Sequence, residues 1–337
     1  MPEAEEPARR KAPTLYDVAR LAGVSHQTVS QVVKSGPNVK PETRRRVEAA
    51  VAQLNYTPNM AARTLATAKS HRIGALFFDR YDEVGPTRTM QAAVDHARDA
   101  GYLVDIVGLD PRSPTRIDSA VDLVLQAGVA GILVFAPAAE VIDAVRQHDI
   151  PVPVEFESIA ASATTGPRTG TRMATEYLAD LGHRRFVHIA GPGSWVPAQH
   201  RARQFHAVVD ERKLVSVAEF EGDWSSRSGY EAGLRMPLDQ GITAIVVAND
   251  QMALGVLKAL KQRDVRVPQD ISVIGFDDIA EAAYFEPALT TISNDFEGQG
   301  RVAMDALLSS IDPSRPRHVE SSRDPVLIVR ESTSAPV

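Results

Sequence analysis

The stretch TLYDVARLAGVSHQTVSQVVKSGPNVKPETRRRVEAAVAQLNY (residues 14–56) places apolar residues at three- and four-residue spacings in three short blocks. The blocks span about 15–22, 26–34 and 41–54. Gly23 suits a tight turn between the first two blocks, and Ser25 is a good N-cap for the second. The pattern therefore predicts a unit of three helices with a helix-turn-helix at its front.

The charge of the chain is unevenly divided. The 337 residues carry a net charge of -6, yet residues 1–72 contain 12 Lys and Arg against 6 Asp and Glu. A small basic segment attached to a large acidic body indicates that only the N-terminus meets a polyanion.

The length predicts two or three domains. The absence of cysteine excludes disulfides and thiolate sites and fits a reducing cytoplasm, which is the expected location.

The segments that flank the three-helix unit have a different character. Residues 1–13 are rich in proline and charge, so they predict a disordered tail rather than a signal peptide. In residues 57–72, Thr57 and Pro58 can begin a short helix over about 58–66. Such a helix is marginal alone, so this segment is interpreted as a linker that orders when something holds it. The longest apolar run, 127–139, is too short to span a bilayer and predicts no membrane segment.

From Ile73 the pattern changes to short apolar runs that alternate with amphipathic helices. Runs such as IGALFF (73–78), GILVF (131–135), AIVVA (244–248) and ISVIGF (271–276) read as buried strands. Strands with helical crossovers predict a parallel, doubly wound α/β architecture, with enough strands for two sheets. Ligand chemistry is expected at the carboxyl ends of these strands.

About eight motifs, among them TLYDVARLAGVSHQTVSQVV, AARTLA, EGDWS, VANDQMALG and ISVIGFDD, occur in the order found in the LacI/GalR family of bacterial transcriptional regulators. The chain resembles this family over nearly its whole length. The resemblance implies a DNA-binding headpiece, a hinge helix, a core of two periplasmic-binding-protein-like subdomains with a ligand cleft, and a homodimer on a pseudo-palindromic operator. The expected parts are a tail (1–13), headpiece (14–57), hinge helix and linker (58–70), and core (71–337), with an N-subdomain of about 71–160 plus 291–318 and a C-subdomain of about 161–290 plus 319–330.

The second predicted helix is expected to enter the major groove of DNA. Its residues His26, Gln27 and Gln31 share one face, since positions 27 and 31 are one turn apart. Gln27 matches the base-reading position of the family, where glutamine can bond adenine. Gln31 stands where many members have arginine, so we expect the operator half-site to differ at the base pair that faces Gln31.

Other residues are expected to contact the DNA backbone or the minor groove. The resemblance implies that Leu65 wedges into the minor groove at the operator centre, with Ala61 and Ala62 keeping the hinge helix thin; packing of Leu65 within the linker is the alternative. The remaining candidates for contact with the DNA, mainly with its phosphates, are Tyr16, Ser25, Ser30, Lys34, Asn38, Lys40, Thr43 and Asn59. For each phosphate contact, a solvated surface position is the alternative.

A sugar site needs an aromatic platform, a carboxylate that accepts from hydroxyls, and a donor fork. At the places that the family uses, Trp224 offers the platform, Asp277 the acceptor and Arg201 the fork, while Asn249 supplies an amide. Core packing, helix capping and surface exposure are the alternatives for these residues. The resemblance also implies ligand contacts from Phe78, Asn294 and Phe296.

Some positions depart from the family pattern at the ligand site. Asn294 and Pro197 differ from known relatives, and the segment 154–168 is several residues shorter, so the aspartate expected on the strand near 154–158 has no evident counterpart. Trp195 replaces a small residue and either adds a second stacking surface or fills space.

These features predict a repressor that a small sugar, most simply galactoside-like, releases from double-stranded operator DNA. A corepressor, a different sugar or a purine remains an alternative, as does a sugar-binding protein without a regulatory role. No cofactor is expected, and the absence of G-x-S-x-G, HExxH and P-loop motifs speaks against an enzyme. No C-terminal heptad repeat follows residue 330, so a dimer is expected rather than a tetramer.

Overall fold

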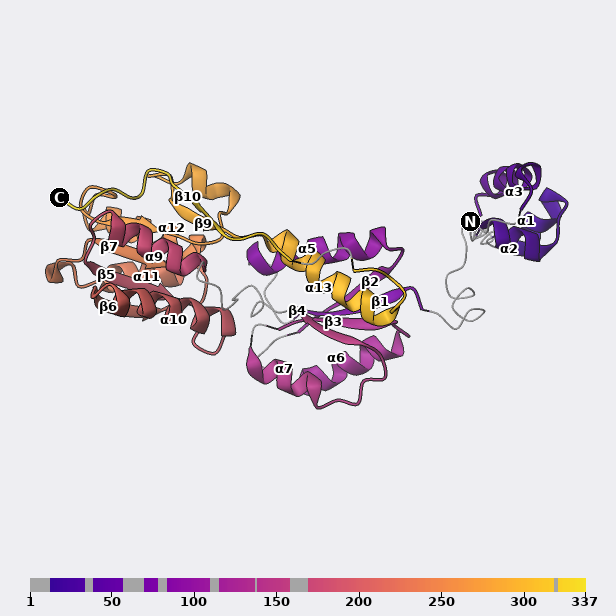
Figure 1. Cartoon of the computed structure of the whole chain (residues 1–337), viewed down its shortest axis with the longest axis horizontal. Coiled ribbons are helices and arrows are strands. Elements are labelled where there is room, and N and C mark those ends of the chain that lie inside the picture. The colour runs from indigo at the N-terminus through magenta and orange to yellow at the C-terminus, as the bar shows by residue number, and fades with distance from the viewer. Residues whose placement is uncertain are drawn as a thin grey trace, which may run out of the picture. The chain divides into compact units, whose positions relative to one another are not determined.

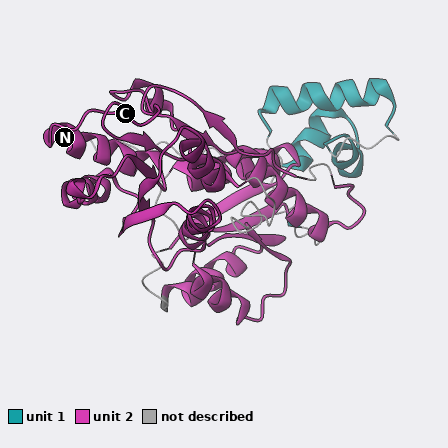
Figure 2. Cartoon of the chain, turned by 60° about the vertical axis from the view of Figure 1, so that its left-hand side comes forward, with its two compact units in different colours: residues 1–70 teal, residues 71–337 magenta. Residues whose placement is uncertain are grey.

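The computed structural model describes residues 13–33, 39–56, 70–77, 84–109, 115–136, 138–157, 169–317 and 321–337. The chain forms two compact units, residues 1–70 and 71–337 (Figure 2). The predicted tail and hinge helix fall almost entirely outside the described residues.

The first unit is a three-helix headpiece, made of α1 (Leu15–Ala22), α2 (His26–Val33) and α3 (Pro41–Leu54). Thr14 and Asp17 form a capping box at the start of α1, and Gly23 ends this helix with a left-handed φ of 63°. The backbone N–H of Thr28 donates to Ser25 Oγ at 3.1 Å, as predicted for an N-cap. The predicted bounds of all three helices therefore hold to within one residue.

The headpiece core consists of small apolar side chains at helical spacing. Val18, Val29 and Val47, one from each helix, are fully buried against one another in a single cluster. Val32 lies one turn along α2 from Val29, on the same face, and is also buried. Since α2 buries these valines, its opposite face remains free for another role.

The N-subdomain of the second unit is a four-stranded parallel sheet in the order β2-β1-β3-β4. Figure 1 shows α5 and α13 over one face of this sheet and α6 and α7 over the other. Alternate residues along β1 explain the two layers, because Leu76 packs towards α6 and α7 whereas Ala75 and Phe77 pack towards α5 and α13. The elements are β1 (Arg72–Phe77), α5 (Val84–Asp99), β2 (Leu103–Gly108), α6 (Thr115–Gln126), β3 (Gly131–Phe135), α7 (Ala139–Arg146), β4 (Val154–Glu157) and α13 (Phe296–Ile311).

The C-subdomain repeats the plan with a parallel sheet in the order β6-β5-β7-β8. One face packs against α11 and α12, and the other against α9 and α10. The elements are α9 (Gly170–Asp180), β5 (Arg185–Ala190), α10 (Val196–Glu211), β6 (Val215–Glu221), α11 (Ser226–Arg235), η1 (Leu238–Gln240), β7 (Ala244–Val247), α12 (Asp250–Gln262), β8 (Ser272–Ile274) and η2 (Ala280–Tyr284). The expected α/β class with two doubly wound parallel sheets is confirmed.

A short antiparallel pair, β9 (Thr291–Ser293) and β10 (Val326–Ile328), joins the two subdomains. Ile292 is buried in the C-subdomain core, and the N–H of Asp277 donates to its carbonyl. The prediction that residues 291–293 belong to the N-subdomain is therefore wrong, because the chain enters that subdomain only with α13, after Ser293. The residues after 330 also stay with the C-subdomain, because the N–H of Val273 donates to the carbonyl of Ser332.

Candidate functional site

The exposed face of α2 is the candidate nucleic-acid interface of the headpiece. His26, Gln27 and Gln31 are exposed, while Ser30 beside them is half-buried. The His26 ring lies 5.3 Å from the exposed ring of Tyr16, which belongs to α1. The structure thus brings these predicted DNA-contacting residues to one surface.

This surface suits a polyanion. The first turn of α2 contains no acidic residue, and a neutral or basic surface is what closely spaced phosphates require. Of the predicted phosphate contacts, Lys40 is exposed and Thr43 is half-buried near the start of α3. Ser25 uses its hydroxyl oxygen as the α2 cap. The other predicted contacts, Lys34, Asn38, Asn59, Ala61, Ala62 and Leu65, lie outside the described residues.

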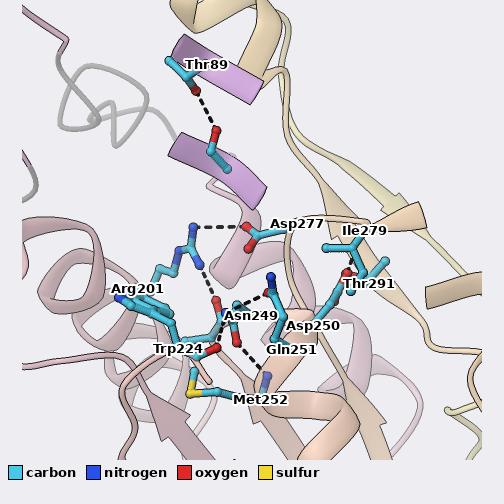
Figure 3. Close-up of polar contacts among 12 residues, drawn as sticks. Thr89, Arg201, Trp224, Asn249, Asp250, Gln251, Met252, Asp277, Ile279 and Thr291 are labelled. Carbon is cyan, nitrogen blue, oxygen red and sulfur yellow. Dashed lines mark hydrogen bonds and ion pairs between the residues drawn. The ribbon is translucent and has the colours of Figure 1, made fainter. Parts of the chain in front are cut away.

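A cleft between the two subdomains brings together most of the predicted ligand residues. Arg201, Trp224, Asn249 and Asp277 line it from the C-subdomain, and Phe296 lines it from α13. The facing wall comes from the start of α5 and consists of Val84, Gly85, Pro86 and Thr89. Figure 3 shows Thr89 on the far side of the site from Arg201 and Asp277. Phe78 lies outside the described residues. Asn294 lines an adjoining cavity instead.

Trp224 is held rigidly on the wall of the cleft. Its backbone has a left-handed φ of 70°, which is uncommon for a bulky side chain. The indole covers Gly191 so closely that a Cβ there would lie 2.2 Å from the ring, so this position requires glycine. The Trp224 Nε1 donor is buried and has no hydrogen-bond partner among the described residues, and a buried unpaired donor in a cleft points to an acceptor on a ligand.

Trp195 is a second aromatic residue in the same cleft. Its ring centroid lies 5.9 Å from that of Trp224 with the planes tilted by 52°. Its backbone forms an isolated antiparallel bridge with Ala138, which belongs to the N-subdomain. Trp195 therefore lines the cleft and contacts both subdomains, so the suggestion that it fills space and the suggestion that it adds an aromatic surface are compatible.

Arg201, on α10, is fixed by several contacts. Its guanidinium donates to Asp277 Oδ1 at 3.3 Å and to the carbonyl of Ala248 (Figure 3). Its Cζ atom lies 3.8 Å from the centroid of the Phe276 ring and 5.4 Å from that of Trp224. A planar cation stacked on aromatic rings and paired with a carboxylate is a preorganised donor fork.

Asp277 on the cleft wall and Asp250 behind it are two buried carboxyls. Burial raises the pKa of Asp277 to about 6, and Arg201 opposes this rise. Burial, then the charge of Asp277, raises the pKa of Asp250 to about 8. Asp277 is therefore ionised at neutral pH and keeps its pairing with Arg201, whereas Asp250 is mostly protonated.

The Asn249 side chain makes its hydrogen bonds within the protein. Its side-chain oxygen accepts from the N–H of Met252 at 2.9 Å and so caps α12, while its Nδ2 donates to the carbonyl of Trp224 at 3.0 Å. Nδ2 also donates to Gln251 Oε1 at 3.0 Å. Asn249 lines the cleft as predicted, but its amide hydrogens already hold the strained Trp224 segment in place.

Several residues of the site were not among the predicted ligand contacts. Phe276, the last residue of ISVIGF, stacks on Arg201, and Asp250 follows the helix cap in VAND. Outside the lining of the cleft, Glu157 at the carboxyl end of β4 is 4% exposed, so the shortened segment still places a carboxylate at this end of the N-subdomain sheet. Alternation of apolar and acidic residues in VEFE was the available signal for that strand.

The described residues contain no group of three His, Asp or Glu side chains arranged to hold a metal ion. Within that same part of the chain, no helix is both long enough and apolar enough to cross a membrane.

Comparisons with known proteins agree with this geometry. Residues 14–59 match the family model described as bacterial regulatory proteins of the lacI family, and residues 175–333 match that of a periplasmic binding protein-like domain. The lactose operon repressor of Escherichia coli K12 is 37% identical over 306 residues, covering 88% of this chain and 84% of the repressor. The ribose operon repressor of the same strain is 31% identical over 336 residues, covering 95% and 99% of the two chains.

Solved structures give the same relation. A lac repressor dimer bound to operator and the anti-inducer ONPF has a TM-score of 0.83 at 35% identity, with 96% of this chain and all of that chain covered. The regulator CelR in complex with cellobiose has a TM-score of 0.68 at 25% identity, with 95% and 99% covered. These relatives are transcriptional regulators rather than enzymes, and the predicted resemblance is confirmed. The chain belongs to the LacI family of bacterial regulatory proteins.

Proposed function

We propose that this protein is a cytoplasmic transcriptional repressor that binds a pseudo-palindromic operator as a homodimer and is released by a small neutral sugar, of galactoside type, bound in the cleft. The observation that carries the ligand class is the meeting of Trp224, Arg201 and Asp277 on one wall. An indole stacks on the C–H face of a sugar, a carboxylate accepts from its hydroxyls, and a guanidinium donates to its oxygens.

The headpiece supplies operator recognition. Its α2 presents His26, Gln27 and Gln31 as an exposed face while Val29 and Val32 anchor the helix from behind. Glutamine reads adenine through N6 and N7, and histidine reaches guanine acceptors. Two copies of this helix on two half-sites give a pseudo-palindromic operator, and the lac repressor dimer bound to operator supports a dimer here.

The cleft supplies the switch. A sugar ring bound in the cleft contacts Trp224 and Arg201 on one side and the start of α5 on the other. These two sides belong to different subdomains, which the bridge between Ala138 and Trp195 also connects. Sugar binding therefore favours one relative orientation of the two subdomains. If the operator favours another orientation, operator and sugar weaken each other's binding by the same factor.

Operator binding titrated with small molecules tests this function. Operator sequences are first selected from a random pool of duplex DNA with the full-length protein, and binding is followed by fluorescence anisotropy. Galactosides such as methyl β-galactoside and lactose, the glucosides cellobiose and maltose, ribose, and the purines hypoxanthine and guanine are then added. We expect a galactoside to weaken operator binding at least tenfold, which is about 1.4 kcal/mol of coupling.

The Trp224→Ala variant is the control for the site. Because it removes the platform without touching the headpiece, we expect it to bind the operator with unchanged affinity and to lose the sugar response. Strengthened operator binding with a purine would instead identify a corepressor mechanism. A selected pool with no enriched sequence would contradict operator recognition altogether.

A further inference from the structure

One buried histidine of the C-subdomain lies outside the cleft and has no part in the proposed function. His188 is fully buried in β5, where Glu219 of β6 and Val246 of β7 are its register partners. The ring of Phe205, from α10, stacks on the imidazole with the centroids 4.6 Å apart and an angle of 15° between the planes. The imidazole is therefore enclosed between the sheet and α10, which packs against β5 and β6 (Figure 1).

A single carboxylate oxygen connects this histidine to α10. Glu219 Oε2 accepts from His188 Nδ1 at 2.9 Å and from Nε2 of His206, on α10, at 2.9 Å. The hydrogen bond from His188 lowers the pKa of Glu219, so this carboxyl is ionised at neutral pH and acts only as an acceptor. We name Glu219, His188 and His206 the clasp.

The second ring nitrogen of His188 is the sensitive point of the clasp. Because Nδ1 carries the hydrogen that is donated to Glu219, Nε2 is unprotonated in the neutral ring. This Nε2 atom is buried and makes no hydrogen bond to any described residue. A second proton would turn it into a buried, charged donor, and an unpaired buried charge is costly.

The surroundings of His188 favour its neutral form. Burial is the main cause that lowers the pKa of His188; the Glu219 carboxylate opposes this shift, and His206 adds to it. On this side of the sheet β7 contributes the apolar Val246, and α9 covers the same face with apolar residues. The titratable residues of α9 have partners elsewhere: Arg172 pairs with Glu176 and Glu211, Asp180 with Arg212, and Tyr177 with Thr333.

Both elements that meet at the clasp also carry residues of the cleft. On α10, Trp195 is the N-cap and Arg201 lies five positions before His206. β6 ends at Glu221, and Trp224 follows three residues later. The contact between Glu219 and His206 therefore fixes the helix that carries Arg201 against the strand that leads to Trp224.

We propose that the clasp is a proton-sensitive switch that holds α10 against β5 and β6 at neutral pH and releases it when His188 takes up a second proton. Release lets water reach Nε2 and moves Arg201 relative to Trp224, so the geometry of the cleft responds to pH. Such a switch acts whatever ligand the cleft takes, and it therefore goes beyond the proposed sugar response. Its sign follows from the lowered pKa of His188, because the clasped state binds fewer protons than the released state and acid favours release.

Hydrogen–deuterium exchange of the ligand-free, full-length protein tests the switch. A solvated histidine has a pKa of about 6.5, so uptake of one proton on release raises the opening equilibrium about tenfold from pH 7.5 to pH 5.5. After correction for the intrinsic exchange rate, we expect the amides of α10 to lose protection by about this factor. The helix α12 packs on the opposite face of the sheet and is the internal reference, which should lose less than threefold. This comparison depends on no substitution.

Two substitutions connect the effect with the clasp. His188→Gln keeps a donor for Glu219 but cannot take up a proton, so the pH response of α10 should fall below threefold. His183→Gln is the matched control, because His183 is a second buried histidine of the same subdomain and its ring bonds Thr243 and Ser334 rather than α10. It should retain the tenfold response.

Tryptophan emission from the same proteins tests the consequence for the cleft, which contains both Trp195 and Trp224. Asp277 also titrates there, with a pKa of about 6, but it is present in every variant. The change in emission from pH 7.5 to pH 5.5 should therefore be smaller in His188→Gln than in wild type. If α10 loses no more protection than α12, or if its response survives in His188→Gln, the switch is overturned. Equal emission changes in wild type and His188→Gln would overturn its connection to the cleft.

Discussion

Asp250 makes the pH dependence of stability a sensitive probe of the cleft. Its carboxyl is fully buried, accepts from the N–H of Ile279 at 2.9 Å and from the Thr291 hydroxyl at 2.6 Å, and lies close behind the loop that carries Asp277 (Figure 3). Asp250→Asn keeps the shape and an acceptor for Ile279. The Thr291 hydroxyl can rotate to accept from the new amide.

The sign of the effect follows from the raised pKa. Folding moves the pKa of Asp250 from 3.8 to about 8, so between these values the folded state binds more protons than the unfolded state. The free energy of unfolding therefore falls as pH rises, by about 1.4 kcal/mol for each tenfold drop in proton concentration. From pH 5 to pH 7.5 this amounts to roughly 3 kcal/mol, which the asparagine variant does not lose.

Urea denaturation of wild type and variant, followed by tryptophan fluorescence at several pH values, measures this difference. Both tryptophans of the chain, Trp195 and Trp224, lie in the cleft, so the fluorescence reports on the C-subdomain, which contains Asp250. We expect the free energy of unfolding of the variant, minus that of wild type, to rise by about 3 kcal/mol as pH rises from 5 to 7.5. Asp270→Asn is the control, since the pKa of Asp270 is lowered to about 2 by Arg266 and its contribution is constant over this range. A variant-minus-wild-type difference that is flat or falls with pH would refute the assignment of a protonated Asp250.

Three further predictions concern single residues. Gln31→Arg should shift the selected half-site towards guanine at the facing base pair, and an unchanged preference in selection from random DNA would contradict that contact. Arg201→Met leaves the buried carboxylate of Asp277 unpaired, so it should weaken sugar binding at least tenfold and lower core stability by about 3 kcal/mol, measured by calorimetry and denaturation; retained sugar affinity would exclude Arg201 as the donor fork. Ser25→Ala removes the cap of α2 and should cost the headpiece about 1 kcal/mol, and a headpiece melting curve that does not move would show that the cap is dispensable.

The headpiece could be predicted closely because its signals are local. Gly23 and Ser25 mark the turn, and Val18, Val29 and Val47 follow helical spacing, so periodicity alone places the helices. The strands β4 and β6 were harder. In β6, Ala218 and Phe220 are only half-buried at the sheet edge, and their mixed polarity gives no continuous apolar run.

The candidate ligand site could be predicted only in part. Trp224, Arg201 and Asp277 were expected together because they stand at the places that the family uses, and the structure brings them to one cleft. The use of Asn249 as a clamp on Trp224 depends on a left-handed backbone at Trp224, which no pattern indicates. Phe296 reaches the cleft because α13 packs beside α5, which is far away in the sequence, and spacing along the chain carries no information about that packing.

Coupling between operator binding and sugar binding is measured most directly by testing whether it is reciprocal. The affinity of the full-length protein for its selected operator is determined with and without saturating sugar, and the affinity for the sugar with and without saturating operator. Linkage requires that both affinities fall by the same factor, at least tenfold here, and that Trp224→Ala abolish both changes. An operator affinity that is unchanged by a sugar that binds the cleft would contradict the proposed release mechanism.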